Sequence, residues 1–85
     1  MTINVEMFSR SNCHLCEIAE SVVRAVQTEI CFEFRVNFID GNQELEKKFG
    51  NEVPVTFING HRHDYFQIDE ARFRSALDLA AAEQV

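Results

Sequence analysis

The chain has 85 residues, 46% of them hydrophobic, with only three glycines and one proline, a composition that favours a single regularly folded domain over residues 1–85. Fourteen acidic residues against eight basic ones give a net charge of −6, which disfavours binding to nucleic acid. No apolar run approaches the length needed to cross a membrane, and residues 1–6 lack the basic start and apolar stretch of a secretory signal. We therefore expect a cytoplasmic protein that associates with neither nucleic acid nor membrane.

The first half of the chain predicts a strand, a helix and a second strand. Alternating apolar residues predict the first strand over residues 3–8. Apolar residues at helical spacing predict a helix over residues 13–28, with Ser11 or Asn12 as its N-cap. Strict alternation of apolar and polar residues predicts a half-buried second strand over residues 30–38. The residues expected on the core face of the helix are Leu15, Ile18, Ala19, Val22, Val23 and Val26.

The segment after the second strand predicts a turn and a short helix. Asp40, Gly41 and Asn42 are turn-forming residues that interrupt the alternation. A short helix is then expected to run to Phe49, and Gly50 to end it in the manner common at helix C-termini.

The last part of the chain predicts a hairpin and a final helix. A third strand is expected over residues 53–58, and Asn59-Gly60 is typical of a two-residue hairpin turn. A fourth strand should therefore return over residues 61–66, and Asp69 can cap a last helix. The expected core face of this helix is Phe73, Ala76, Leu77, Ala80 and Ala81.

The expected order of elements is β-α-β-α-β-β-α, an α/β fold with a four-stranded mixed sheet and helices on both faces. Because a long helix connects the first two strands, these strands should be parallel and joined by a right-handed crossover. The last two strands should form an antiparallel hairpin. The phenylalanines assigned to the core are Phe8, Phe32, Phe34, Phe38, Phe57 and Phe73.

Two cysteines, Cys13 and Cys16, stand at the predicted start of the first helix. One helical turn separates them, so they can form a reversible disulfide. The unpaired N–H groups and the dipole of a helix N-terminus stabilise a thiolate, which is the nucleophile in disulfide exchange. Cys13 is nearer the helix start and is the expected nucleophile, whereas Cys16 is the expected buried, resolving thiol. The third cysteine, Cys31, then has no partner and is expected to be a buried structural thiol.

Two segments of the chain, one around the cysteine pair and one around Pro54, carry the motifs of a known family. Residues 5–16 read Val-Glu-Met-Phe-Ser-Arg-Ser-Asn-Cys-His-Leu-Cys, similar to the glutaredoxin order of apolar strand, Phe-Ser, basic residue and cysteine pair. Residues 53–60 read Val-Pro-Val-Thr-Phe-Ile-Asn-Gly and look like the family's Val-Pro-x-x-Phe-Ile-Asn-Gly. The Cys-His-Leu-Cys form followed by Glu17 resembles a subgroup of small glutaredoxin-like proteins. The resemblance implies a thioredoxin fold and a thiol–disulfide oxidoreductase.

The resemblance also implies roles for residues outside the cysteine pair. A cis peptide bond before Pro54 would face the cysteines, and the backbone of Val53 would pair with the backbone of a substrate. Arg10 would complement the thiolate or a substrate carboxylate. Asp64 and Tyr65 stand where glutaredoxins hold glutathione, so they would shape the substrate groove. Each residue also has an interpretation without function, as a surface charge or a strand end.

The chain departs from the glutaredoxin pattern at two places. His14 and Leu15 replace Pro-Tyr between the cysteines. His14 can stabilise the thiolate or donate a proton to a leaving thiol, or be an exposed helix residue without a role. Residues 63–67, His-Asp-Tyr-Phe-Gln, replace the Gly-Gly and acidic residues that hold glutathione, so that site looks altered. We expect no bound cofactor, with glutathione or a thioredoxin reductase as the candidate electron donor.

The leading hypothesis is a monomeric dithiol–disulfide oxidoreductase acting on disulfides of proteins or small molecules. One alternative is a binding module that keeps the fold without redox turnover. Another is a carrier of a metal ion or an iron–sulfur cluster. Cys13, Cys16, His61 and His63 nominally supply a Cys₂His₂ set, but zinc-finger ligand pairs lie closer in sequence, so we expect no metal.

Overall fold

The computed structural model describes residues 2–83 and contains the expected elements in the expected order. Met1, Gln84 and Val85, which the single-domain prediction includes, lie outside the described residues. The elements are β1 (Asn4–Ser9), α1 (His14–Gln27), β2 (Glu33–Phe38), α2 (Gln43–Phe49), β3 (Val55–Ile58), β4 (His61–Tyr65) and α3 (Glu70–Glu83). None of the helices within residues 2–83 is long and apolar enough to span a bilayer.

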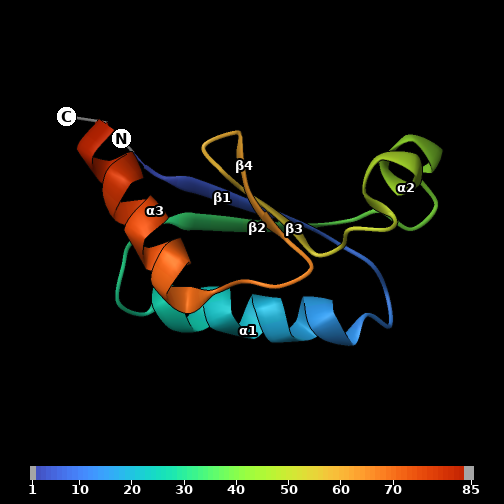
Figure 1. Ribbon diagram of the computed structural model, residues 1–85, viewed down its shortest axis with the longest axis horizontal. Coiled ribbons are helices and arrows are strands. Elements are labelled where there is room, and N and C mark those ends of the chain that lie inside the picture. Colours follow the sequence, from blue (N-terminus) through green and yellow to red (C-terminus); the bar gives the residue numbers. More distant parts are fainter. Residues whose placement is uncertain (1, 84–85) are drawn as a thin grey trace.

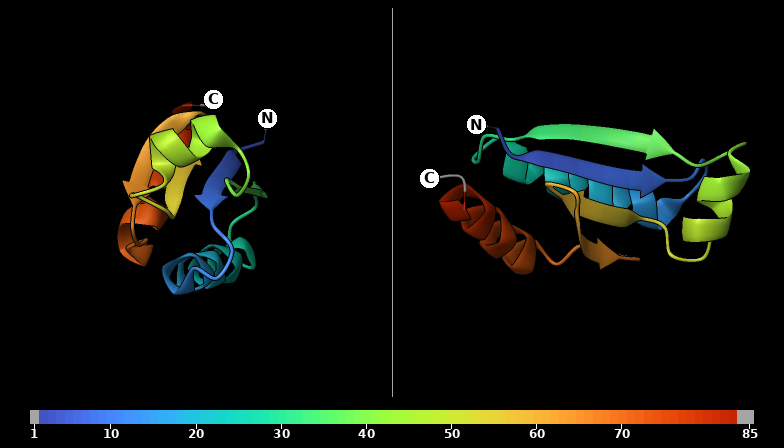
Figure 2. Two further views of the ribbon diagram at one scale, coloured as in Figure 1. Left: turned by 90° about the vertical axis from the view of Figure 1, so that its right-hand side faces the viewer. Right: turned by 90° about the horizontal axis from the view of Figure 1, so that it is seen from above.

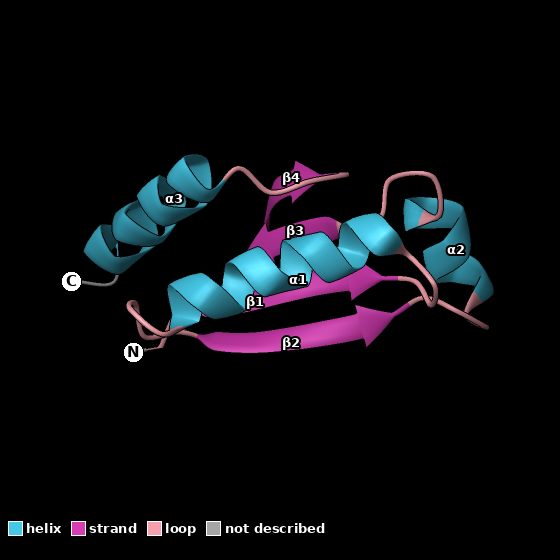
Figure 3. Cartoon of the chain, turned by 90° about the horizontal axis from the view of Figure 1, so that it is seen from below, coloured by secondary structure: helices cyan, strands magenta, loops and turns pink. Residues whose placement is uncertain are grey.

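The four strands form one mixed sheet in the order β2-β1-β3-β4 (Figure 1). β1 pairs with β2 in parallel, and β3 pairs antiparallel with both β1 and β4. The predicted topology is therefore confirmed. Since β1 runs into the loop before α1, the first helix begins at the carboxyl end of β1, beside the start of β3 (Figure 3).

Helices cover both faces of the sheet. α1 and α3 lie on one face, and the short α2 lies over one end of the other face (Figure 2). Met7 is fully buried in a cluster with Ala19 and Val23 of α1. Its neighbour in the strand, Phe8, points the other way and stacks on Phe49 of α2 with ring centroids 4.6 Å apart. Successive side chains of β1 thus pack against helices on opposite faces of the sheet.

The main apolar core lies between the sheet and the pair α1 and α3. It combines strand residues with one stripe of each helix, because residues at helical spacing share a face. The buried members are Ile3, Val5, Met7, Ala19, Val23, Val26, Phe32, Ile58, Phe73, Leu77 and Ala80. The described residues thus place one continuous core on the α1 side of the sheet.

In the second half of the chain, the predicted hairpin turn and the predicted helix cap are both confirmed. Asn59 and Gly60 have φ values of 50° and 82°, the positive values that a type I′ hairpin turn requires. The N–H of Arg72 donates to Asp69 Oδ1 at 3.0 Å, so Asp69 caps α3.

The predicted N-cap of the first helix is wrong. Cys13 is the N-cap, with an extended backbone at φ −105°. Asn12 lies in the left-handed region at φ 59°, and Ser11 instead bonds to Asp40. Cysteine is not among the usual N-cap residues, because sulfur is a weak hydrogen-bond acceptor.

Four apolar residues predicted in the core are exposed. Leu15 and Ile18 are each 47% exposed because they lie on the flank of α1 next to its buried stripe. Phe38 is 58% exposed because it is the last residue of an edge strand. Ala81 is also exposed, since the buried stripe of α3 consists of Phe73, Leu77 and Ala80.

The second strand begins later than predicted, and this corrects the prediction for Cys31. The N–H groups of Glu29 and Ile30 both donate to Val26 O at 2.9 Å, so the chain is still turning there. Cys31 consequently lies in the connection before β2 and is exposed rather than buried.

Gly50 ends α2, but without the left-handed conformation that is common at helix ends. Its φ and ψ are −54° and −31°. A Cβ at this position would meet the carbonyl oxygen of Glu46, and it would lie 3.1 Å from the guanidinium of Arg10. Close approach of Arg10 and the last turn of α2, rather than a positive φ, therefore requires glycine here.

His63 on β4 is half-buried beside Phe73, with ring centroids 5.8 Å apart, and its Nε2 has no hydrogen-bond partner among the described residues. Burial lowers the pKa of His63 below 6.5, which the charge of Asp64 opposes and that of Arg72 reinforces. The folded protein therefore binds this proton less readily than the unfolded chain. Its contribution to stability is complete above pH 6.5 and falls as the pH drops from 6.5 through the lower folded-state pKa.

We expect His63→Gln to remove this part of the pH dependence. Urea midpoints of the wild type and the variant, measured from pH 8 to pH 5 in steps of about half a unit, should diverge in slope below about pH 6.5. His61→Gln is the matched control, because His61 is exposed at the hairpin. Equal slopes for wild type and His63→Gln would contradict the assignment.

Candidate active site

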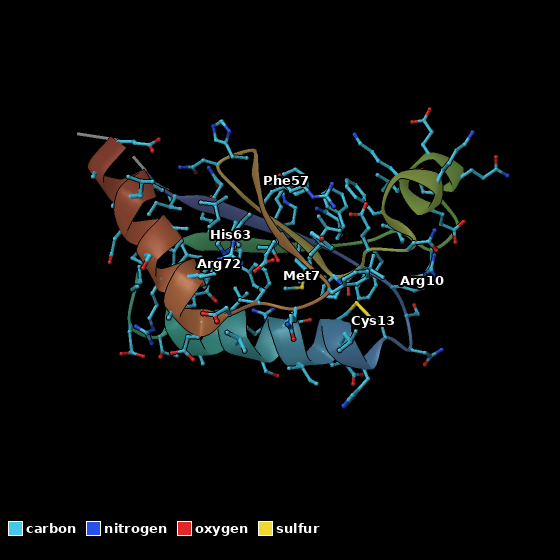
Figure 4. All side chains as sticks on the ribbon, in the orientation of Figure 1. Met7, Arg10, Cys13, Phe57, His63 and Arg72 are labelled. Carbon is cyan, nitrogen blue, oxygen red and sulfur yellow. A yellow bond between two sulfur atoms is a disulfide. The ribbon has the colours of Figure 1, made fainter. Side chains whose placement is uncertain are left out.

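Cys13 and Cys16 form a disulfide at the start of α1, with their Cα atoms 5.2 Å apart (Figure 4). Cys13 is partly exposed, whereas Cys16 is only 3% exposed. The N–H of Cys16 donates to Cys13 Sγ at 3.2 Å. An N–H group of the first helical turn thus already points at the sulfur that would carry negative charge after reduction.

The loop before Cys13 is held by a residue that the sequence did not single out. Asp40, just after β2, accepts hydrogen bonds from the Ser11 N–H at 2.9 Å and from Ser11 Oγ at 3.1 Å. The N–H of Ile39 also donates to Ser9 O at 2.9 Å. The end of β2 therefore anchors the chain that leads into Cys13. An Asp-Gly pair directly after a predicted strand was the available signal, because Asp favours turns through its side chain.

The hydrogen bond from the Ser11 N–H is the largest cause that holds the pKa of Asp40 below 3.8, and burial opposes it. Since the folded-state pKa lies below the unfolded one, this contribution to stability is present above pH 3.8 and is lost as the pH falls through the folded-state value. Asp40→Ala should therefore unfold at lower urea concentration than the wild type at pH 6, and the difference should shrink toward pH 2. Asp78→Ala, on the exposed side of α3, is the control. A difference that stays constant with pH would contradict this role.

His14, a predicted catalytic residue, is the first residue of α1 and points into solvent. Its side chain is 84% exposed, and Nδ1 lies 3.8 Å from Glu17 Oε2. The two side chains form an exposed pair beside the disulfide. His14 is therefore accessible to a substrate that approaches Cys13.

Arg10 points toward α2 rather than toward the disulfide (Figure 4). Its guanidinium lies against Gly50, and its charge contributes to lowering the pKa of Asp40. Arg10, Lys47 and Lys48 form no ion pair with the other described residues, in contrast to the remaining arginines. Among the described residues, the basic side chains without an ion pair thus lie at the end of the molecule that carries the disulfide.

Val53 and Pro54 precede β3, and the peptide bond between them is cis. Pro54 is fully buried, and Val53 is partly exposed. The pairing of Phe8 with Val55 places Pro54 opposite the end of β1, which leads into the cysteine loop. The backbone of Val53 has no hydrogen-bond partner among residues 2–83.

Asp64 and Tyr65, two further predicted site residues, point in different directions from β4. The carboxylate of Asp64 pairs with Arg72 of α3 at 3.3 Å and also accepts from the N–H of Tyr65 at 3.1 Å. Tyr65 is 48% exposed and pairs with Val55, next to Pro54. Tyr65 is therefore available to a ligand, whereas Asp64 is occupied by α3.

Exposed apolar side chains gather at the end of the molecule that carries the disulfide. Leu15 and Ile18 belong to the first two turns of α1, Tyr65 is the last residue of β4, and Phe66 follows it. Phe66 has a positive φ of 66°, and its N–H donates to Glu52 O at 3.1 Å, which fixes the chain beside Val53. We call Leu15, Ile18, Tyr65 and Phe66 the apolar rim. The exposure of the rim was not predicted, because Leu15 and Ile18 have the helical spacing of core residues.

The histidines of β4 do not join the cysteines. His61 pairs with Ile58 at the hairpin end of the sheet, opposite the end where Pro54 and Cys13 lie. Within residues 2–83 no group of three or more His, Cys, Asp or Glu side chains is arranged to hold a metal ion. The nominal Cys₂His₂ set is thus not assembled.

The fold and the disulfide together define a class, that of thioredoxin-fold proteins with a CxxC pair at the start of the first helix. The X-ray structure of a thioredoxin from Fasciola hepatica aligns at a TM-score of 0.62 and 26% identity, covering 91% of this chain and 79% of that one. An X-ray structure of a structural-genomics target from X. campestris aligns at a TM-score of 0.75 and 29% identity, covering 88% of this chain and 96% of that one.

The family model of the glutaredoxin-like domain (DUF836) matches residues 4–78, so the chain belongs to the glutaredoxin-like family. A protein of Dictyostelium discoideum named glutaredoxin-like is 30% identical over 90 residues, covering 99% of this chain and 83% of that protein. An uncharacterized protein of Mycobacterium tuberculosis is 29% identical over 76 residues, covering 84% of this chain and 78% of that protein. The resemblance noted in the sequence is thus confirmed at the level of the family.

Proposed function

We propose that the protein is a dithiol–disulfide oxidoreductase. In the reduced protein the Cys13 thiolate attacks a substrate disulfide, forms a mixed disulfide and releases one substrate thiolate. Cys16 then attacks Cys13 Sγ, the bond between Cys13 and the substrate breaks, and the second substrate thiolate leaves. The two thiolates take up the protons that Cys13 and Cys16 have lost. The substrate gains two electrons, and the protein is left with the disulfide seen here.

The observation that carries this proposal is the unequal environment of the two sulfurs. Cys13 is partly exposed and receives the N–H of Cys16, while Cys16 is buried one turn further along α1. A nucleophile must be accessible and ionised, and a resolving thiol must be close but shielded from substrate. The disulfide shows that the two sulfurs lie within bonding reach.

The surroundings of Cys13 support disulfides of proteins or small molecules as substrates. The unpaired backbone of Val53 offers one donor and one acceptor to an extended peptide, in the manner of a short β-augmentation. The apolar rim offers exposed apolar contact surface from α1 and from the end of β4. His14, exposed beside Cys13, is proposed to stabilise the thiolate or to protonate the leaving thiol. Arg10 and Tyr65 are proposed to contact the substrate.

The electron donor in this proposal is glutathione or a thioredoxin reductase. The segment 63–67 carries bulky side chains, and Asp64 is engaged by Arg72, which argues for weaker glutathione binding than in glutaredoxins. We place the protein in a reducing compartment such as the cytoplasm, where a disulfide is catalytic more often than structural. We propose that it acts as a monomer.

The test is equilibration of the protein in glutathione redox buffers, followed by acid quenching, alkylation and mass spectrometry. We expect a reversible two-electron transition of the Cys13–Cys16 pair, with Cys31 titrating separately. Turnover of insulin disulfides with glutathione and glutathione reductase, and separately with thioredoxin reductase, should identify the donor. A pair that does not cycle, or no turnover with either donor, would overturn the proposal.

A further inference from the structure

Two polar residues are buried in the described part of the chain, and the hydroxyl of Thr56 has no hydrogen-bond partner. Ser9 is 4% exposed and Thr56 is fully buried. Thr56 Oγ1 makes no hydrogen bond in this disulfide form of the protein. A buried hydroxyl without a partner is unfavourable. A state of the protein that supplies a hydrogen-bond partner removes this cost.

Thr56 lies on the face of the sheet that α1 covers. It is paired directly with Met7, and directly paired residues of antiparallel strands project to the same face. Met7 belongs to the buried cluster that includes Ala19 and Val23 of α1, and Figure 4 shows its side chain pointing toward α1. The hydroxyl is therefore beneath the helix that carries the cysteines, two residues along β3 from Pro54.

Cys16 is the residue of α1 that faces this end of the sheet. It is the first buried residue of the helix, one turn before Ala19, and so lies nearer than Ala19 to the end of β1 and the start of β3. Cys16 is not among the members of the main apolar cluster, although it is only 3% exposed. Two buried hydroxyl residues lie at this end of the sheet on the α1 side, namely Thr56, opposite Met7, and Ser9, two residues after Met7 on β1.

We propose that the Thr56 hydroxyl is the hydrogen-bond partner of the Cys16 sulfur in the reduced protein. This rests on the proposed function, because it requires that the disulfide opens. In the disulfide form the Cys16 sulfur has no proton to donate, and the Thr56 hydroxyl makes no hydrogen bond to it. After reduction by two electrons and two protons, the Cys16 thiol donates to Oγ1, or its thiolate accepts from the hydroxyl. The Thr56 hydroxyl therefore has a hydrogen-bond partner only in the dithiol form.

The consequence is a bias toward the dithiol. The unsatisfied hydroxyl raises the free energy of the disulfide form, and the new hydrogen bond lowers that of the dithiol form. When Cys16 attacks the mixed disulfide, its thiolate forms while the hydroxyl donates to it, and the proton passes to the departing substrate thiolate. Thr56 therefore tunes the reduction potential and assists the resolving step without supplying electrons.

Thr56→Val tests the proposal, because valine keeps the β-branched shape that suits a strand and removes only the hydroxyl function. We expect the equilibrium constant for reduction of the pair to fall about tenfold, which corresponds to a potential lower by about 30 mV. The variant should also melt at a higher temperature than the wild type in the disulfide form, and gain less or nothing in the dithiol form. Thr56→Ser should keep the wild-type potential.

A second pair of variants removes any dependence on how valine packs. Thr56→Ala and Thr56→Ser both lack the γ-methyl group of threonine and differ from each other by the hydroxyl alone, so the alanine variant should show the lower potential of the two. Equal potentials for Ala and Ser, or an unchanged potential in Thr56→Val, would overturn the role of Thr56. A wild-type pair that fails to cycle in glutathione or dithiothreitol buffers would instead overturn the oxidoreductase itself.

Discussion

Replacing Cys13 with serine is expected to abolish disulfide turnover, with kcat/KM reduced by about three orders of magnitude or more. Serine keeps the N-cap position and still accepts the N–H of Cys16, so the fold should be retained. Its hydroxyl does not ionise near neutral pH, and it is therefore not a nucleophile toward sulfur. The measurement is insulin reduction with whichever donor supports the wild type, together with circular dichroism to confirm folding.

Cys16→Ser should behave differently from Cys13→Ser. Cys13 can still attack a disulfide, but no thiol resolves the product, so a mixed disulfide with the substrate or with glutathione should accumulate on Cys13. Mass spectrometry of the non-reduced protein would detect the adduct. Cys31→Ser is the control, because Cys31 is exposed near the start of β2, at the end of the sheet away from the disulfide. Full turnover by Cys13→Ser, or its loss in Cys31→Ser, would contradict the assigned roles.

The order of elements could be predicted because local patterns and global topology agree. The alternation in β1, the helical spacing in α1 and the Asn59-Gly60 turn each specify one element, and short connections leave few ways to join them. The predictions failed where tertiary neighbours decide exposure. Ile18 has the spacing of a core residue, yet it is exposed because the sheet contacts only one stripe of α1.

The chemistry of the site was predictable in part, because the CxxC pair and its neighbours lie close together in sequence. The exposure of Cys13 and the burial of Cys16 follow from their order on one helical turn. Contacts between distant segments were not predictable. Asp40 reaches Ser11 across 29 positions, and Thr56 is placed beneath α1 only by its pairing with Met7. A pattern within one segment carries no information about such pairings.

The packing of α3 rests on few side chains, and we expect Phe73→Ala to be the most destabilising single change in the core. Phe73 is fully buried, edge-on to Phe32 at 5.8 Å and beside His63 at 5.8 Å. Truncation of a buried phenylalanine costs about 3–5 kcal/mol in transfer free energy and cavity formation. Domains of this size are stable by only about 5–15 kcal/mol, so the variant should lose a large share of its free energy of unfolding.

Urea denaturation of Phe73→Ala should show a lower midpoint with an unchanged slope, and the melting temperature should fall by roughly 12 °C or more. Leu79→Ala provides the matched control on the same helix, because Leu79 is 62% exposed and its truncation leaves no cavity. The control should change the free energy of unfolding by less than about 0.5 kcal/mol. Since only Phe73, Leu77 and Ala80 of α3 are buried, a comparable loss in both variants would show that α3 is held by its exposed face, against the core described here.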